Sequence, residues 1–189
     1  MRWDALFDDM ESQIAEADRL ALEAEINERS RAELVTVALE DRLRAALGLR
    51  IGVHLSCGES VQGEVMHVGA DALLLNDDQH QVLVPFAAAA RYVGLGRHAN
   101  AGAPPVRRAI GLAHSLRCLA RDRADLSVTL GGGAGTVRLS GVIDRVGKDY
   151  IDLASVSVGE ARRHHNVGQV STRPLAALAM VRSRMRGDM

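Results

Sequence analysis

Residues 63–75 read GEVMHVGADALLL, and residues 141–153 read GVIDRVGKDYIDL. Both stretches carry glycine at their first and seventh places, aspartate at the ninth, and aliphatic residues at the third, sixth, eleventh and thirteenth. A repeat of this kind indicates that each copy folds as one supersecondary unit. The sequence therefore predicts a chain built from two related units, each centred on a pair of β-strands.

The repeat extends beyond these two stretches. Val-x-Leu at residues 53–55 recurs at 128–130, and the Pro-Ala-Ala pattern of residues 84–89 recurs at 173–178. The copies are offset by 75 residues at the first strand, 78 at the glycine stretch and 89 at the proline. Such insertions collect in surface loops, where extra length costs little closure entropy. We expect the strands to be kept in both copies and two loops to be longer in the second.

Bulk composition sets wide bounds on the class of protein. The chain has 189 residues, 47% of them hydrophobic and only 3% aromatic, so its core has to be built from Val, Leu, Ile and Ala. No apolar run approaches the roughly 18–20 residues that span a bilayer, and the acidic start differs from a signal peptide. We therefore expect a cytoplasmic protein without a membrane partner, in which Cys57 and Cys118 are free thiols.

The net charge of −1 hides a strong asymmetry. Residues 1–47 carry 12 acidic and 6 basic side chains, whereas residues 104–189 carry 7 acidic and 14 basic ones. An acidic N-terminal segment and a basic C-terminal half indicate either head-to-tail association or a polyanionic partner for the C-terminal half. The positive charge is almost all arginine, with Lys148 the only lysine, and a high-GC genome gives the same bias.

Residues 1–48 are expected to form an amphipathic helical segment. Its apolar residues follow the i, i+3, i+4 spacing of one helix face, and this expected partner-helix face consists of Trp3, Leu6, Phe7, Met10 and Ile14, followed by Ala17. Ser30-x-x-Glu33 has the pattern of a capping box, which predicts a break or kink at residues 27–30. The apolar stripe has to pack on the rest of the chain or on another subunit.

From residue 49 the hydrophobic period changes to two, as in strands. Five short strands, with one helical turn before the last, predict a small half-open β-barrel over residues 49–96. A linker and an arginine-rich helix follow at 97–124, then a second small barrel at 125–183 and a tail at 184–189. The expected fold class is therefore α+β: a helix followed by two small β-barrels.

This order of features, with its Gly-x-h-x-x-h and Pro-h-Ala-Ala-h patterns (h, hydrophobic), resembles the Sm-like barrels and more loosely the SH3-like barrel of ribosome maturation factors. It also resembles a family of actinobacterial proteins labelled Fis-type transcriptional regulators, although residues 126–182 have the period of strands rather than of a helix-turn-helix. The Sm-like resemblance covers roughly residues 50–95 and 124–182 and implies RNA binding. Asp71 and Asp149 stand eight places after their glycines rather than six or seven, so the family's nucleotide pocket is not carried over.

Three local patterns carry residue types that chemistry or ligand binding uses. The glycines of residues 131–135 lack the Gly-Lys-Ser/Thr of a phosphate loop and are expected to form an enlarged hairpin loop. Asp71 and Asp149 are each expected at a strand bend, accepting hydrogen bonds from their own backbone. Residues 161–166 (ARRHHN) fall in the loop that gained eleven residues. The alternatives for this segment are contact with a phosphate, a carboxylate or a partner, or a loop that is simply solvated.

Two functions from different classes follow. The first is a non-enzymatic regulatory protein that binds nucleic acid, RNA more than DNA, through its basic half. The residues expected to contact the anion are Arg107, Arg108, Arg117, Arg121, Arg162, Arg163, His164 and His165. The second is a scaffold or adaptor that self-associates or docks a protein partner through the N-terminal helix. No nucleophile–base pair or metal-ligand cluster stands at a catalytic spacing, so neither an enzyme, a cofactor nor a metal is expected.

Overall fold

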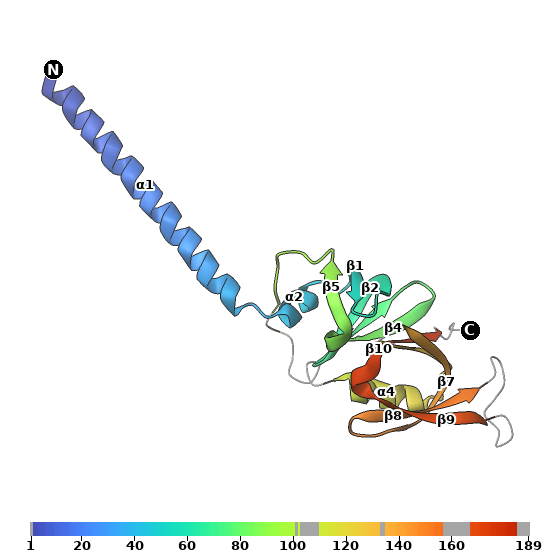
Figure 1. Ribbon diagram of the computed structural model, residues 1–189. Coiled ribbons are helices and arrows are strands. Elements are labelled where there is room, and N and C mark those ends of the chain that lie inside the picture. The colour runs from blue at the N-terminus through green and yellow to red at the C-terminus, as the bar shows by residue number, and fades with distance from the viewer. Residues whose placement is uncertain (1, 101, 103–109, 133–134, 157–166, 185–189) are drawn as a thin grey trace. The chain divides into compact units, whose positions relative to one another are not determined.

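The computed structural model describes residues 2–100, 102, 110–132, 135–156 and 167–184 (Figure 1). It divides the chain into two compact units, Met1–Ala38 and Leu39–Met189. The first unit is the helix α1 (Arg2–Thr36), and the second contains the sheet with the short helices α2 (Leu39–Ala45) and α4 (Leu112–Arg121).

α1 runs without interruption to Thr36, so the break predicted at residues 27–30 is wrong. The helix stops only two residues before α2 begins at Leu39. α2 packs on strand β2, and its Leu43 is completely buried. The helical segment is therefore interrupted at residues 37–38, next to the packing of α2 on the sheet, and not at the capping pattern of Ser30.

Each copy of the sequence repeat supplies five strands and one turn of 3₁₀ helix, in the same order. The first copy consists of β1 (Arg50–Leu55), β2 (Ser60–Val68), β3 (Ala72–Asn76), β4 (His80–Pro85), η1 (Phe86–Ala88) and β5 (Ala89–Val93). The second copy consists of β6 (Leu126–Leu130), β7 (Val137–Val146), β8 (Tyr150–Val156), β9 (Val167–Pro174), η2 (Leu175–Ala177) and β10 (Leu178–Arg184). The predicted strands and the single turn before the last strand are confirmed. The strands β6 and β7 on either side of residues 131–135 pair antiparallel, and residues 133–134 lie outside the described part of the chain.

The two copies agree down to their irregularities. The β2–β3 register shifts between Val65 and His67, and the β7–β8 register shifts at the counterparts 78 residues later, Ile143 and Arg145. The turns agree as well, because the Phe86 N–H donates to the carbonyl of Asp71 at 2.8 Å and the counterpart bond from Leu175 to Asp149 is 2.7 Å. The repeat is therefore a repeat of backbone geometry.

The conserved glycine of each copy allows two strands to approach closely. A Cβ atom on Gly63 would lie 2.5 Å from the carbonyl oxygen of Asn76, and one on Gly141 would meet the carbonyl oxygen of Ala154. Asn76 and Ala154 are themselves counterparts at the same offset of 78 residues. A side chain at either glycine would push the β2–β3 or the β7–β8 pair apart.

The expected pair of separate small barrels is wrong. The strands form one ten-stranded antiparallel sheet in the order β5-β1-β2-β3-β4-β10-β6-β7-β8-β9, which is not closed into a barrel. The copies are joined because β4 pairs with β10, with Leu83 opposite Val181 and Val82 opposite Arg182. An aliphatic strand such as β4 is unstable as an open edge, and pairing it with β10 satisfies its backbone groups and covers Leu83.

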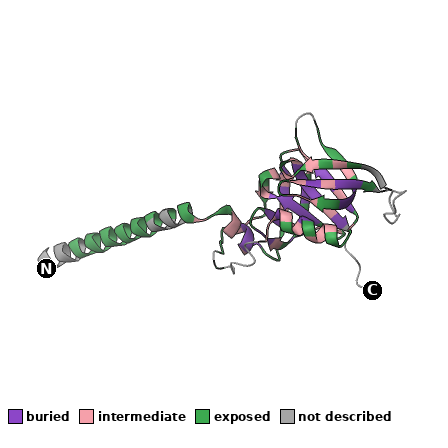
Figure 2. Cartoon of the chain, turned by 90° about the horizontal axis from the view of Figure 1, so that it is seen from below, coloured by how far each residue is buried: buried purple, intermediate pink, exposed green. Residues whose placement is uncertain are grey.

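The two copies also share their hydrophobic cores (Figure 2). The cluster built around the first copy includes Ala179 and Met180 from β10. The cluster built around the second copy includes Ala72 and Leu83 from β3 and β4. Each core therefore needs residues from the other copy, and the sheet unit behaves as one body rather than two.

The basic helix expected over residues 106–123 is observed as α4, Leu112–Arg121, and residues 103–109 lie outside the described part of the chain. Its start is fixed by the first copy, because Asp71 Oδ1 accepts a 2.6 Å hydrogen bond from the Leu112 N–H. The Ala70 N–H also donates to the carbonyl of Ile110 at 3.2 Å. The expected bonds from Asp71 to its own backbone are thus replaced by a cap on a helix 41 residues away.

Candidate functional site

The partner-helix face predicted on α1 is exposed wherever its side chains are described. Trp3, Leu6 and Phe7 lie in the helix, but their side chains are outside the described set. Met10 is 49% exposed and Ile14 is 58% exposed. α1 therefore presents large apolar side chains to solvent, as the exposed surface along the helix in Figure 2 shows.

This apolar face is longer than the sequence analysis recognised. The spacing of three and four residues continues from Ile14 through Ala17, Ala21 and Ala24, all exposed. We call the row Met10, Ile14, Ala17, Ala21 and Ala24 the α1 seam. Alternating steps of three and four are typical of a helix that packs along a second helix. Extending the count of the helical spacing past Ala17 would have found the rest of the seam.

Charged side chains lie on the face of α1 opposite the seam. Arg19 forms ion pairs of 2.6 Å with Glu16 and 2.7 Å with Glu23, one turn to either side. The hydrogen bond from Arg19 lowers the pKa of the Glu16 carboxyl, and the same bond raises the pKa of the guanidinium. Ion pairs at these spacings stabilise an exposed helix only modestly. They therefore do not make up for the stabilisation that burial of the seam would give.

Most of the residues predicted to bind an anion lie outside the described chain. These are Arg107, Arg108, Arg162, Arg163, His164 and His165. Arg117 and Arg121 are described and exposed on α4. Arg117 donates to the carbonyl of Gly147 at 3.4 Å, and Arg121 lies 3.9 Å from the Asp122 carboxylate. The structure therefore describes only two of the eight predicted residues, and the predicted site stays a prediction.

Residues 110–156 of the basic half are nearly balanced in charge. Within residues 110–156 there are six basic and five acidic side chains. The excess positive charge of the C-terminal half is contributed mainly by residues 104–109 and 157–189. A surface that tracks a phosphate backbone needs a run of basic side chains, and residues 110–156 do not supply one.

A shallow hollow of about 310 Å³ lies where the two copies meet. Its walls include Cys57 and Ala87 from the first copy and their counterparts Gly132 and Ala176 from the second. Cys57 is half-buried with a free thiol. The described walls carry no acidic, basic or cationic side chain that could activate the Cys57 thiol by proton transfer.

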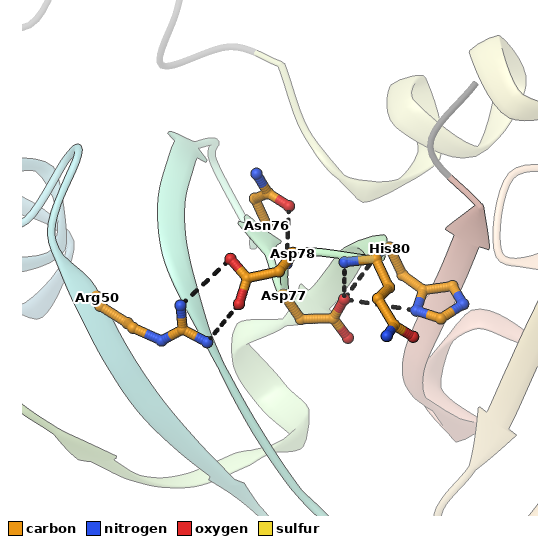
Figure 3. A network of polar contacts seen from close by, with 6 residues as sticks. Arg50, Asn76, Asp77, Asp78 and His80 are labelled. Carbon is orange, nitrogen blue, oxygen red and sulfur yellow. Dashed lines mark hydrogen bonds and ion pairs between the residues drawn. The ribbon is translucent and has the colours of Figure 1, made fainter. Parts of the chain in front are cut away.

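The best-connected polar network lies at the β3–β4 turn (Figure 3). Arg50 holds both carboxylate oxygens of Asp78, at 3.3 and 2.9 Å, and the hydrogen bond lowers the pKa of Asp78. Asp77 Oδ1 accepts the N–H of His80 at 2.7 Å, and Asn76 Oδ1 accepts the N–H of Asp78 at 3.1 Å. Asp78 has a φ of 73°, which its side chain tolerates. This network shapes a tight turn.

Comparisons with known proteins add no family. No protein-family model matches the chain, and no curated protein is similar to it. Among the described residues, no three His, Cys, Asp or Glu side chains lie together as metal ligands would. Over the same residues, no helix is both long and apolar enough to cross a membrane.

Proposed function

We propose that this protein is a non-enzymatic scaffold that assembles with a second copy of itself through the α1 seam. The observation that carries the proposal is the exposure of Met10 and Ile14 on an uninterrupted 35-residue helix. Most helical stability in proteins comes from packing an apolar face. Burial of the seam against another helix supplies that stability.

The size of the seam residues favours an antiparallel pair. The larger side chains, Met10 and Ile14, lie in the first half of α1, and the small residues Ala17, Ala21 and Ala24 lie in the second half. An antiparallel arrangement sets large residues opposite small ones, which fills the space between helices without voids. A parallel pair would instead set Met10 against Met10 and leave gaps along the alanines.

The charges favour the same direction. Residues 2–18 carry six acidic and one basic side chain, whereas residues 19–36 carry four acidic and three basic ones. A parallel pair would place the two strongly acidic halves side by side. An antiparallel pair places each of them beside the nearly balanced half of its partner, which reduces like-charge repulsion.

The test is the mass of the full chain by light scattering, for the wild type and for Met10→Glu/Ile14→Glu. We expect the double variant to lose the α1-dependent association, since it buries charge in the seam. Ile26→Glu is the matched control, because Ile26 is equally exposed, at 57%, but faces away from the seam. Unchanged mass in the seam variant, or an equal loss in the control, would rule the seam out.

The direction of the pair is tested with cysteines introduced into α1 after Cys57 and Cys118 are replaced by serine and alanine. The antiparallel pair predicts that Met10→Cys/Ala24→Cys forms disulfides between chains. Met10→Cys alone should not, because residue 10 of one chain lies far from residue 10 of the other. Efficient cross-linking by the single variant would show a parallel pair.

Nucleic-acid binding through the basic half stays a prediction. It is supported by the excess of arginine over residues 104–189 and by the exposed Arg117 and Arg121. Base-stacking side chains are scarce in this half, where Tyr150 is the only aromatic residue. Titration with RNA and duplex DNA at two salt concentrations tests it, and Arg162→Ala/Arg163→Ala should weaken any salt-sensitive binding.

A further inference from the structure

Among the residues that the structure describes, the ten-stranded sheet ends in two strands that pair on one side only. β5 pairs with β1, and β9 pairs with β8, so these strands are the two ends of the strand order. By the repeat, β5 is the counterpart of β10 and β9 is the counterpart of β4. These are the strand positions that pair with each other where the copies join. We call the β4–β10 pair the internal joint. Each chain therefore also carries a counterpart of each of these two strands, β9 and β5, at the ends of its sheet.

The internal joint predicts a register for the unused edges. Within the chain, Val181 lies opposite Leu83 and Arg182 lies opposite Val82. Shifting each strand by the repeat offset of 89 residues sets Tyr92 opposite Thr172 and Val93 opposite Ser171. The next pair in this register is Gly94 opposite Val170. Val93 and Val170 are each 48% exposed, so both unused edges present an aliphatic side chain to solvent.

The helices that precede the two copies differ in the same way, because the first leucine of one is buried and the first leucine of the other is exposed. Leu112 begins α4 and is only 6% exposed, in the same hydrophobic cluster as Ala72 and Leu83 of the first copy. Leu39 begins α2, in the corresponding place before β1, and is 47% exposed. Leu112 is therefore buried at the internal joint, whereas its counterpart Leu39, at the end of the sheet that carries β5, is exposed to solvent.

We propose that β9 of one chain pairs antiparallel with β5 of a second copy in this register, and that the contact covers Leu39. The two surfaces differ, so the contact is head-to-tail, and every added copy leaves the same two edges open. Such a contact closes into a ring or continues as a filament. It is separate from the α1 seam and requires no part of that helix.

The contact between chains is expected to be weaker than the joint within the chain. Thr172 stands where the joint has Leu83, and Arg91 stands where it has Met180. Arg91 also lies 3.1 Å from His54 Nε2 on its own sheet. Polar and charged residues on an edge strand reduce its tendency to pair. Assembly should therefore depend on protein concentration, whereas the internal joint does not.

Cysteine cross-linking of the full chain tests both the contact and its register, with Cys57 and Cys118 replaced as above. Residues directly opposite in an antiparallel pair have Cα atoms about 4.5–5.5 Å apart, within the range of a disulfide. Val93→Cys/Ser171→Cys should form a ladder of covalently linked chains on mild oxidation. Val93→Cys/Thr172→Cys is the out-of-register control and should cross-link several-fold less, since residue 172 faces the other side of the strand.

The outcomes separate this contact from others. The single variants Val93→Cys and Ser171→Cys should give no ladder, and dimers formed by either one would overturn the head-to-tail contact. Leu39→Asp should reduce the ladder severalfold, whereas Met66→Asp, at a similarly exposed residue on β2, should not. A ladder that persists with Met10→Glu/Ile14→Glu present shows independence from the α1 seam. No ladder at any concentration would overturn the proposal.

Discussion

The carboxylate of Asp71, at the β2–β3 bend, accepts a 2.6 Å hydrogen bond from the backbone N–H of Leu112, the first residue of α4. This bond connects the first copy of the repeat to the helix that opens the second copy. It lies beside the contact in which the Ala70 N–H donates to the carbonyl of Ile110. The two copies are therefore joined at a bend and a helix start as well as along β4 and β10.

Replacing Asp71 by alanine should lower the free energy of unfolding by about 0.5–2 kcal/mol, because α4 loses the acceptor for its first N–H group. Urea denaturation of the full chain measures the change. Asp149→Ala is the matched control, because Asp149 is the exposed counterpart, and the hydrogen bond that it accepts among the described residues is made by its backbone carbonyl, which the substitution keeps. Equal losses in both variants would show that the bond to Leu112 is not the cause.

Gly63→Ala and Gly141→Ala should each destabilise the sheet by about 1–3 kcal/mol, since the new methyl group meets a backbone carbonyl of the adjacent strand. Gly52→Ala serves as the control. Its methyl group would lie 3.6 Å from the Cβ atom of Val93, an ordinary contact. Thermal or urea unfolding that ranks Gly52→Ala with the other two would contradict the close approach of the strands.

The leucines that begin the two helices give a matched pair. Leu112→Ala should cost about 2–5 kcal/mol of stability, because it opens a cavity between α4 and the residues of the first copy. Leu39→Ala should change the stability of dilute protein by no more than about 0.5 kcal/mol, because Leu39 is half exposed. Similar losses from both substitutions would mean that α2 is as tightly held as α4.

Arg50→Gln should raise the pKa of Asp78 toward the ordinary aspartate value of about 3.9. In the wild type the hydrogen bond from Arg50 lowers that pKa. The stabilisation by this pair is therefore fully present above the ordinary value and is lost as the pH falls through the lowered one. NMR titration of the side-chain carboxyl measures both, and Arg91→Gln, which removes a charge elsewhere, should leave the Asp78 pKa unchanged.

The candidate sites differ in how far the sequence could predict them. The helical spacing placed Met10 and Ile14 on one face of a helix, and both side chains are exposed in the structure. The eight expected anion contacts were grouped by charge along the chain, yet of these only Arg117 and Arg121 fall among the described residues. Charge patterns report which residues carry charge, but the distances between them depend on how the loops fold.

The sequence by itself determined the repeat. Strand periodicity, the glycines at 63 and 141 and the Pro-Ala-Ala turns depend on contacts close along the chain, and all of them appear in the structure. Only the tertiary structure decided how the copies combine. The pairing of β4 with β10, the exchange of Met180 and Leu83 between cores and the Asp71 bond to Leu112 join residues far apart in sequence. A periodic pattern shows which face of a strand is apolar, but its backbone edge pairs equally well with any strand that reaches it.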